Sequence, residues 1–526
     1  MEPMIAFHID MNIAQFTRAY LEKLLSELAR LGYNAVIWEV ENNIAWDTCP
    51  ECRAAEAFSK AEFRQIVDRC RQLNLEPIPL LQTIGHCEYV LKHERYKPLA
   101  EVPSRIDQYC PRNEQVMPFL HRWIEEYYEV FGDVKHFHLG ADEAYTLGHC
   151  PRCKAFAQEH SLSQLYIDHI NEVARPVLAR GGRPIIWADM ALHYNEALDR
   201  LSRQIMLFDW NYGRYHGSGW VAIWGRGGRR ADTLTREERL QYGKYMFPHG
   251  DEQGREPDPF YTADYLAEAG FDVVICPGSM CYGNNVFTPR NWLHVINTYD
   301  SFNKALQAHM AGGCLTSWTV HLTPYELQWA PIDLAPWVRE NPAAPVEMFQ
   351  PHFVRQRFGC DDWEPFWTAC GLLSKASLFT HTASLGYDKA GLPVPLDHVK
   401  KTLEKLDNEG HVEKELINSQ DRLEEYLQGL SLLAEWAPQA TTGKEILDWW
   451  LLAARNLVNR AQATIFLLDR QRGGHPAAGR KVLQEMQFLR EQMFKAYEPV
   501  MRPTRRREAI DWIFASMLAA MEAAAG

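Results

Sequence analysis

Short apolar runs alternate with helical periodicities through the first 320 residues. Residues 4–9 have the pattern of a buried strand, and Leu21, Leu24 and Leu28 then recur at helical spacing until Gly32. The same unit of strand and helix recurs along the chain, with strand runs at 4–9, 35–40, 78–82, 135–140, 185–188, 205–208, 273–276 and 314–318. Eight such units predict a (β/α)8 TIM barrel, an α/β fold, with an open doubly wound sheet as the alternative.

Two segments break this rhythm. Residues 211–258 are rich in Gly, Arg, Tyr and Trp, which predicts an insertion after strand six on the active face of the barrel. After about residue 340 the strand signal ends, and 403–432 and 446–468 show helical periodicity with charged outer faces. We therefore expect a catalytic barrel over 1–338, with the insertion at 211–258, and an all-helical C-terminal domain over 339–526. Trp449 and Trp450 of that domain are interpreted as packing residues.

The composition is that of an ordinary globular protein and limits the partners. The 526 residues are 46% hydrophobic and 23% charged, and 55 Lys and Arg against 68 Asp and Glu give a net charge of −13. Without a long basic run, nucleic acid is excluded as an expected partner. No apolar run reaches the ~18 residues of a membrane span, and the N-terminus lacks the pattern of a secretory signal. We expect no membrane contact and a cytoplasmic protein.

Strand four leads into the segment His-Phe-His-Leu-Gly-Ala-Asp-Glu at 136–143. Barrel enzymes place their catalytic groups at the C-terminal ends of the strands, so Asp142 and Glu143 are the first catalytic candidates. The alternative is a solvated turn or a helix cap.

This segment resembles the His-x-Gly-Gly-Asp-Glu motif of glycoside hydrolase family 20, the β-N-acetylhexosaminidases, with Ala141 in place of the second glycine. The resemblance includes Trp-Glu-Val-Glu at 38–41 and the stretch 78–93, covers roughly residues 4–335, and is closest to the short intracellular branch, hexosaminidase D. It implies an exo-acting glycoside hydrolase that removes terminal β-linked GlcNAc or GalNAc from glycosides and oligosaccharides by retaining, substrate-assisted catalysis without a catalytic cofactor.

The resemblance also implies roles for particular residues. Adjacent carboxylates cannot easily flank one glycosidic bond, so the 2-acetamido oxygen of the substrate would be the nucleophile. Glu143 would be the general acid and base, and Asp142 would orient the acetamide. The remaining substrate-binding candidates are the wall tryptophans Trp187, Trp210 and Trp318, the histidines His86 and His138 behind the acid, Tyr282 for the acetamide oxygen, and Asp189 and Glu326 for sugar hydroxyls.

Each of these assignments has a simpler alternative, and two positions depart from the family pattern. The tryptophans can be barrel packing, the histidines can be satisfied core residues, and the two hydroxyl-binding carboxylates can be solvated. The arginine that larger relatives carry on strand one has no counterpart here, where the strand is apolar near Ile5, and Gln82 replaces an aspartate before Gly-His. The choice between GlcNAc and GalNAc therefore stays open.

Two Cys-Pro-x-Cys knuckles stand apart from the family motif. Cys49 and Cys52 follow strand two, while Cys150 and Cys153 follow strand four. Four such cysteines can form a closed tetrahedral zinc site, so we expect one shared structural zinc that pins the loops and takes no part in catalysis. The alternatives are free thiols or two redox pairs, and strand three separates the two loops.

Two other functions remain open from the sequence. One is a barrel that binds glycans or a partner without catalysis, and the other is a zinc-dependent hydrolase that uses the cysteines directly. The long helices of the C-terminal domain suit either a homodimer or packing against the chain's own barrel.

Overall fold

Eight parallel strands close into a barrel in the computed structural model, which describes residues 2–248, 256–281, 283–318, 322–342, 344–381 and 395–525. In order around the barrel they are β1 (Met4–Asp10), β2 (Ala35–Glu39), β3 (Glu76–Leu80), β4 (His136–His138), β5 (Arg183–Trp187), β6 (Met206–Trp210), β9 (Val273–Cys276) and β11 (Gly312–Ser317). The barrel closes where β1 pairs with β11, from Met4 opposite Gly312 to Ile9 opposite Ser317, and β10 (Gly278–Met280) adds to β11. The closure confirms the predicted barrel and excludes the open sheet.

The strands are buried on both faces, which explains why they appear in the sequence as continuous apolar runs. Their inward side chains, among them Ala6, Ile37, Ile185 and Phe208, form an apolar cluster inside the barrel. A second, larger cluster fills the layer between the strands and the surrounding helices.

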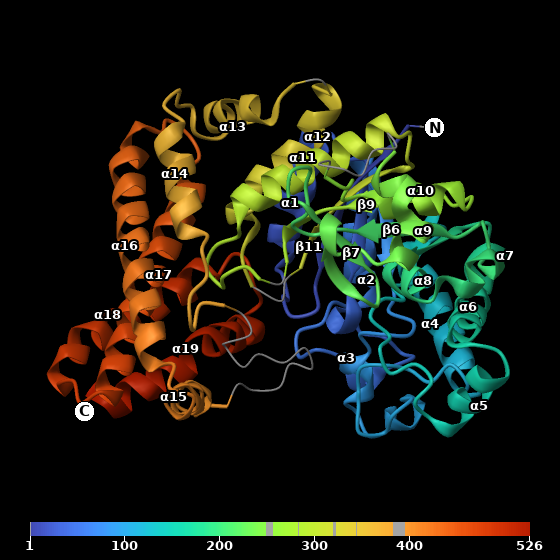
Figure 1. Cartoon of the computed structure of the whole chain (residues 1–526), viewed down its shortest axis with the longest axis horizontal. Coiled ribbons are helices and arrows are strands. Elements are labelled where there is room, and N and C mark those ends of the chain that lie inside the picture. The colour runs from blue at the N-terminus through green and yellow to red at the C-terminus, as the bar shows by residue number, and fades with distance from the viewer. Residues whose placement is uncertain are drawn as a thin grey trace.

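The helices surround the barrel on its outside (Figure 1). They are α1 (Arg18–Leu31), α2 (Lys60–Gln72), α3 (Glu88–Leu91), α4 (Val116–Phe131), α5 (Pro151–Glu159), α6 (Leu162–Val173), α7 (Arg175–Ala179), α8 (Asp189–His193), α10 (Tyr261–Glu268), α11 (Asn291–Gln307) and α12 (Trp329–Glu340). A capping box formed by Ser59 and Glu62 starts α2. α6 and α7 are separate helices, because Pro176 lacks the N–H that would continue the hydrogen-bond ladder of α6.

The insertion after β6 folds into a small unit of its own. β7 (Trp220–Ile223) and β8 (Gly227–Arg230) form an antiparallel hairpin, and α9 (Arg236–Met246) follows. Val221, Ile223 and Met246 are buried in a separate apolar cluster of this unit.

The C-terminal region is all-helical, as predicted. It contains α13 (Phe349–Phe358), α14 (Glu364–Leu373), α15 (His398–Asn408), α16 (Val412–Trp436), α17 (Lys444–Gln471), α18 (Gly479–Ala496) and α19 (Pro503–Ala525). Trp449 and Trp450 lie in its core, where Trp450 packs edge-on against Phe366. The predicted boundary after residue 338 falls within the last turn of α12, so the division into two domains at that residue stays a prediction.

These helices lie beside the barrel (Figure 1) and contact loops that leave the C-terminal ends of its strands. The backbone N–H of Thr17 donates to Val500 at 2.9 Å, and the N–H of Arg502 donates to Gln15 at 2.8 Å. The Arg502 guanidinium also lies 3.5 Å from the centre of the Phe58 ring. In the described residues, no helix has the length and apolar character that a bilayer crossing requires.

Candidate active site

The loop after β4 presents the two predicted catalytic carboxylates on a strained backbone. Gly140, Ala141 and Glu143 all have left-handed backbone angles, with φ of 62°, 79° and 50°. Such angles are costly for residues with a Cβ and are typical of functional loops that their surroundings hold in place. Here the Tyr166 hydroxyl donates to the Ala141 carbonyl at 3.0 Å, and the N–H of Glu143 donates to Asp189 Oδ2 at 3.0 Å.

His86, on the loop after β3, contacts both carboxylates through one nitrogen. Its Nε2 lies 3.0 Å from Asp142 Oδ2 and 3.2 Å from Glu143 Oε2. The Asp142 side chain is 7% exposed and the Glu143 side chain 36%, so Glu143 is the more accessible of the two. Within the described residues, the buried Oδ1 of Asp142 has no hydrogen-bond partner. The site therefore holds one accessible carboxyl and one buried acceptor that a ligand can satisfy.

Gly85 brings the backbones of the two loops into contact. A Cβ at this position would lie 2.0 Å from the carbonyl oxygen of Asp142. Only glycine fits so close an approach, and the position of Asp142 is thus fixed from the neighbouring loop.

A buried polar network lies at the ends of β1, β2 and β3, and it was not among the predicted functional groups. His8 Nε2 lies 2.9 Å from Glu39 Oε2, and Gln82 Nε2 donates to Glu39 Oε1 at 2.8 Å. Burial alone would raise the pKa of Glu39, but the hydrogen bond with His8 lowers it. Glu41 is also buried, and burial together with the charge of Glu39 raises its pKa well above the usual range.

Two polar residues of this network were visible in the sequence of strand one. The strand-one position described as apolar near Ile5 is followed, toward the active face, by buried His8 and Asp10. Polar residues at the C-terminal ends of barrel strands are functional candidates by the same rule that selected Asp142. Applied to every strand, that rule would have found the network.

Two of the three predicted wall tryptophans meet at the mouth of the barrel interior. The rings of Trp187 and Trp318 have centroids 5.8 Å apart, and His8 lies 4.7 Å from Trp318. Trp187 is fully buried among the inward side chains, whereas Trp318 is half-buried. Trp187 therefore forms the floor of this region and Trp318 part of its rim.

The third tryptophan, Trp210, belongs to an aromatic group that includes the insertion. Its ring stacks on Tyr212 at 5.1 Å and meets Trp224 of the insertion edge-on at 4.3 Å. Tyr212 in turn lies 6.2 Å from Trp318, which connects the two groups. The insertion was predicted on this face, but Tyr212 and Trp224 were not among the predicted site residues.

His138 and Asp189 support the loop that carries Asp142 and Glu143, which together are called the dyad. His138 is fully buried, and its Nδ1 accepts the N–H of Gly140 at 3.0 Å. Burial, and then the proximity of His8, lowers the pKa of His138 well below the usual range, so its ring is neutral. Burial, and then the charge of Asp142, raises the pKa of Asp189 well above the usual range.

Glu326 and Tyr282 complete the predicted set. The structure does not support a sugar-binding role for Glu326, because α1 already engages its carboxylate: Tyr20 donates a hydrogen bond at 2.6 Å and Lys23 lies 3.5 Å away. Tyr282 lies outside the described residues.

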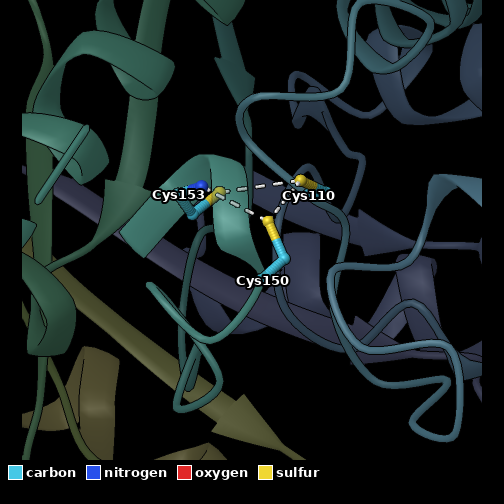
Figure 2. Close-up of side chains that lie close together, drawn as sticks. All are labelled: Cys110, Cys150 and Cys153. Carbon is cyan, nitrogen blue, oxygen red and sulfur yellow. Dashed lines mark hydrogen bonds between the residues drawn. The ribbon is translucent and has the colours of Figure 1, made fainter. Parts of the chain in front are cut away.

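The four predicted zinc ligands do not come together. Cys49 and Cys52 form a disulfide with each other, whereas the sulfurs of Cys150 and Cys153 lie beside Cys110 (Figure 2). The physical reason is the strand order: the loop after β3 lies between the loops after β2 and β4, and it supplies Cys110 to the second knuckle.

The fold and this site point to one class of protein. A (β/α)8 barrel with a carboxylate pair after β4, beside half-buried aromatic rings that suit the flat apolar face of a sugar, is the arrangement expected of a glycoside hydrolase.

Comparison with known proteins agrees with this class. The family model described as "Glycosyl hydrolase family 20, catalytic domain" matches residues 11–222, which include the dyad. Hexosaminidase D of Bos taurus is 29% identical over 238 residues, or 41% of this chain and 69% of that protein. Hexosaminidase D of Homo sapiens is 30% identical over 188 residues, or 35% of this chain and 39% of that protein. A crystal structure of Flavobacterium johnsoniae chitobiase aligns with a TM-score of 0.48 at 14% identity, covering 97% of this chain and 78% of that one.

Residues 11–222 are therefore identified as a glycosyl hydrolase family 20 catalytic domain.

Proposed function

We propose that the chain is an exo-acting β-N-acetylhexosaminidase that hydrolyses terminal β-linked GlcNAc or GalNAc by substrate-assisted retaining catalysis. The observation that carries the proposal is the convergence of Asp142 and Glu143 on one nitrogen of His86. Glycosidases with two protein carboxylates hold them on opposite faces of the sugar, about 5 Å or about 6.5–9.5 Å apart. Two carboxylates that share one partner atom approach a sugar from the same side, so the nucleophile must come from the substrate's own acetamide.

Glu143 is the proposed general acid. Its side chain is the more accessible member of the pair, so it can reach the glycosidic oxygen and protonate it as the bond breaks. The same carboxylate then removes a proton from the water that opens the cyclic intermediate. His86 holds Glu143 in this orientation from behind.

Asp142 is the proposed orienting group. Its unpartnered Oδ1 can accept the N–H of the acetamide, which would turn the acetamide oxygen toward the anomeric carbon. Its negative charge, held in a buried site, would stabilise the positive charge that develops on the acetamide during attack. Both effects are larger in the transition state than in the ground state.

The proposed substrate pocket is completed by the aromatic groups. Trp318 and Trp210 are half-buried and offer rings for sugar stacking, while Trp187 closes the floor. Trp224 extends this wall from the insertion, and we assign it to the pocket as well.

The first test compares release of nitrophenol from the β-GlcNAc, β-GalNAc and β-glucose derivatives. We expect cleavage of one or both acetamido sugars and none of glucose, because glucose lacks the nucleophile. Glu143→Gln and Asp142→Asn should each lower kcat/KM by roughly 10²- to 10³-fold, as removal of a preorganised catalytic group typically does. Asp361→Asn, an exposed change in another Asp pair, is the matched control and should keep full activity.

The rival functions give different results in the same assay. Comparable cleavage of glucose would show a protein carboxylate as nucleophile and refute the proposed mechanism. Saccharide binding without turnover in both the wild type and Glu143→Gln would identify a binding protein.

A further inference from the structure

Three cysteines outside the proposed catalytic machinery have the spacing of metal ligands. In the described residues the sulfurs of Cys110, Cys150 and Cys153 all lie within 4.8 Å of one another (Figure 2). Cys110 Sγ is 3.6 Å from each of the other two. Around a tetrahedral zinc with Zn–S bonds of about 2.3 Å, the sulfurs are about 3.8 Å apart. A disulfide would bring two of them to about 2.05 Å, so the spacing fits a metal better than a bond.

The local backbone and charges favour thiolates at this cluster. Cys150 caps the start of α5, where its sulfur accepts the N–H of Cys153 at 3.3 Å. The Arg152 guanidinium lies 4.0 Å from Cys110 Sγ. Thiolate, the form that binds metals, is stabilised by such helix starts and cations.

The cluster sits where the two loops of the active site are joined. Glu101 accepts hydrogen bonds from the N–H of Cys150 at 3.3 Å and from Gln108 Nε2 at 2.8 Å. The Gln108 side chain also accepts the N–H of Thr146 at 2.9 Å. Glu101, Gln108 and Cys110 follow β3, whereas Thr146 and Cys150 follow β4. The contacts of Glu101 with Cys150 and of Gln108 with Thr146 therefore join the loop of His86 to the loop of Asp142 and Glu143.

We propose that Cys110, Cys150 and Cys153 bind one structural zinc ion, with a water as its fourth ligand, and that this ion fixes the loop of His86 to the loop of Asp142 and Glu143. Zinc is the divalent ion that best suits a tetrahedral site of buried thiolates. Cys110 and Cys153 are fully buried and Cys150 is half-buried, which suits a structural ion. Cys49 and Cys52 are not ligands in this assignment.

The test is metal content, which does not depend on the proposed enzymatic activity. The full-length chain, purified under reducing conditions, should carry one zinc per chain by elemental analysis. Cys110→Ser should lower the zinc content at least tenfold after dialysis against a weak chelator, and the double change Cys150→Ser with Cys153→Ser should remove it. The matched control, Cys49→Ser with Cys52→Ser, removes two buried cysteines from the neighbouring loop and should keep the full zinc content.

A second measurement covers variants that fail to fold. Apo wild-type protein titrated with Co²⁺ should develop a thiolate-to-cobalt charge-transfer band that saturates at one equivalent, and prior alkylation of Cys110 should abolish it. Zinc retained by Cys110→Ser but lost from the Cys49 and Cys52 double variant would overturn the assignment. So would reduced wild-type protein without zinc and without a cobalt band, or a native disulfide between Cys110 and either partner.

Discussion

Substitution of Gly85 by alanine tests whether the loop after β3 sets the position of the dyad. Gly85 has ordinary backbone angles, so alanine brings no conformational strain of its own. The whole effect comes from space: the new Cβ would lie 2.0 Å from the carbonyl oxygen of Asp142, where ordinary contacts begin at 3.4 Å. The loops after β3 and β4 must therefore move apart, or distort, by about 1.4 Å, the difference between these two distances.

The expected magnitude follows from this displacement. Misplacing a catalytic group by about 1 Å costs roughly 10²-fold in rate, equivalent to about 2.7 kcal/mol of transition-state stabilisation. The extra carbon should also lower the free energy of unfolding by about 1–3 kcal/mol, the usual cost of overpacking. We therefore expect kcat/KM for the β-GlcNAc derivative to fall at least 100-fold in a variant that still folds.

The assay pairs kinetics with stability measured in the same buffer. Gly371→Ala is the matched control, because Gly371 lies within α14 and an added Cβ meets nothing within 4 Å. That change should leave kcat/KM unchanged and add roughly 0.5–1 kcal/mol of stability. If Gly85→Ala kept wild-type kcat/KM at an unchanged Tm, contact between the loops would not determine the catalytic geometry, and the reasoning would be wrong.

Three further predictions concern the wall, a buried acid and a buried arginine. Trp224→Ala should raise KM for the β-GlcNAc derivative several-fold with little change in kcat, because Trp224 packs against Trp210. The control Trp220→Ala changes an exposed residue of the same hairpin and should alter neither KM nor kcat. Equal effects of the two changes would place Trp224 outside the pocket. Burial raises the pKa of Asp209 to about 7, above the unfolded value of about 3.9, so the stability it contributes is full below pH 4 and is lost as the pH rises to 7. Denaturant unfolding at several pH values should therefore show the free energy of unfolding of Asp209→Asn rising relative to that of the wild type, by up to about 4 kcal/mol, between pH 4 and 7. A constant difference between the two proteins would contradict the pKa. Arg460 is fully buried beside Phe287 and Phe514, with one hydrogen bond to Ile513 at 2.8 Å. Arg460→Ala should cost about 3–5 kcal/mol by leaving a cavity, whereas Arg460→Met, which fills it, should cost far less, and equal losses in thermal unfolding would show that the charge matters more than the volume.

The barrel was predictable because its signal is local. Each strand is buried on both faces and thus appears as a short apolar run, and capping residues such as Ser59 mark where a helix begins. The break between α6 and α7 was also readable in principle, since Pro176 lies at it. The boundary near residue 338 stays a prediction, because α12 continues through Pro336 and past residue 338 to Glu340.

The candidate site was predictable only as far as motifs reach along the chain. Asp142, Glu143 and His86 lie in recognisable segments, and the structure brings them together. The partners of Glu326 and of the cysteine knuckles are set by contacts between distant segments, such as Tyr20 with Glu326 and Cys110 with Cys150, which no local pattern encodes. The His8 and Glu39 pair shows the intermediate case, since the residue types were visible but their contact was not.

The loops after β3 and β4 are linked at several separate points, and these links explain both a success and a failure of the prediction from the sequence. His86 contacts the dyad, Gly85 meets the Asp142 backbone, Gln108 accepts from Thr146, and Cys110 joins the second knuckle. Neighbouring strands of a barrel place their loops side by side, so links of this kind form most easily between consecutive units. The contact of His86 with Asp142 and Glu143 from the preceding unit fits that rule, whereas a zinc site that skips a unit violates it. The same rule favours cysteines from adjacent loops as metal ligands, because a metal holds the catalytic loops together only if it bridges segments that already touch.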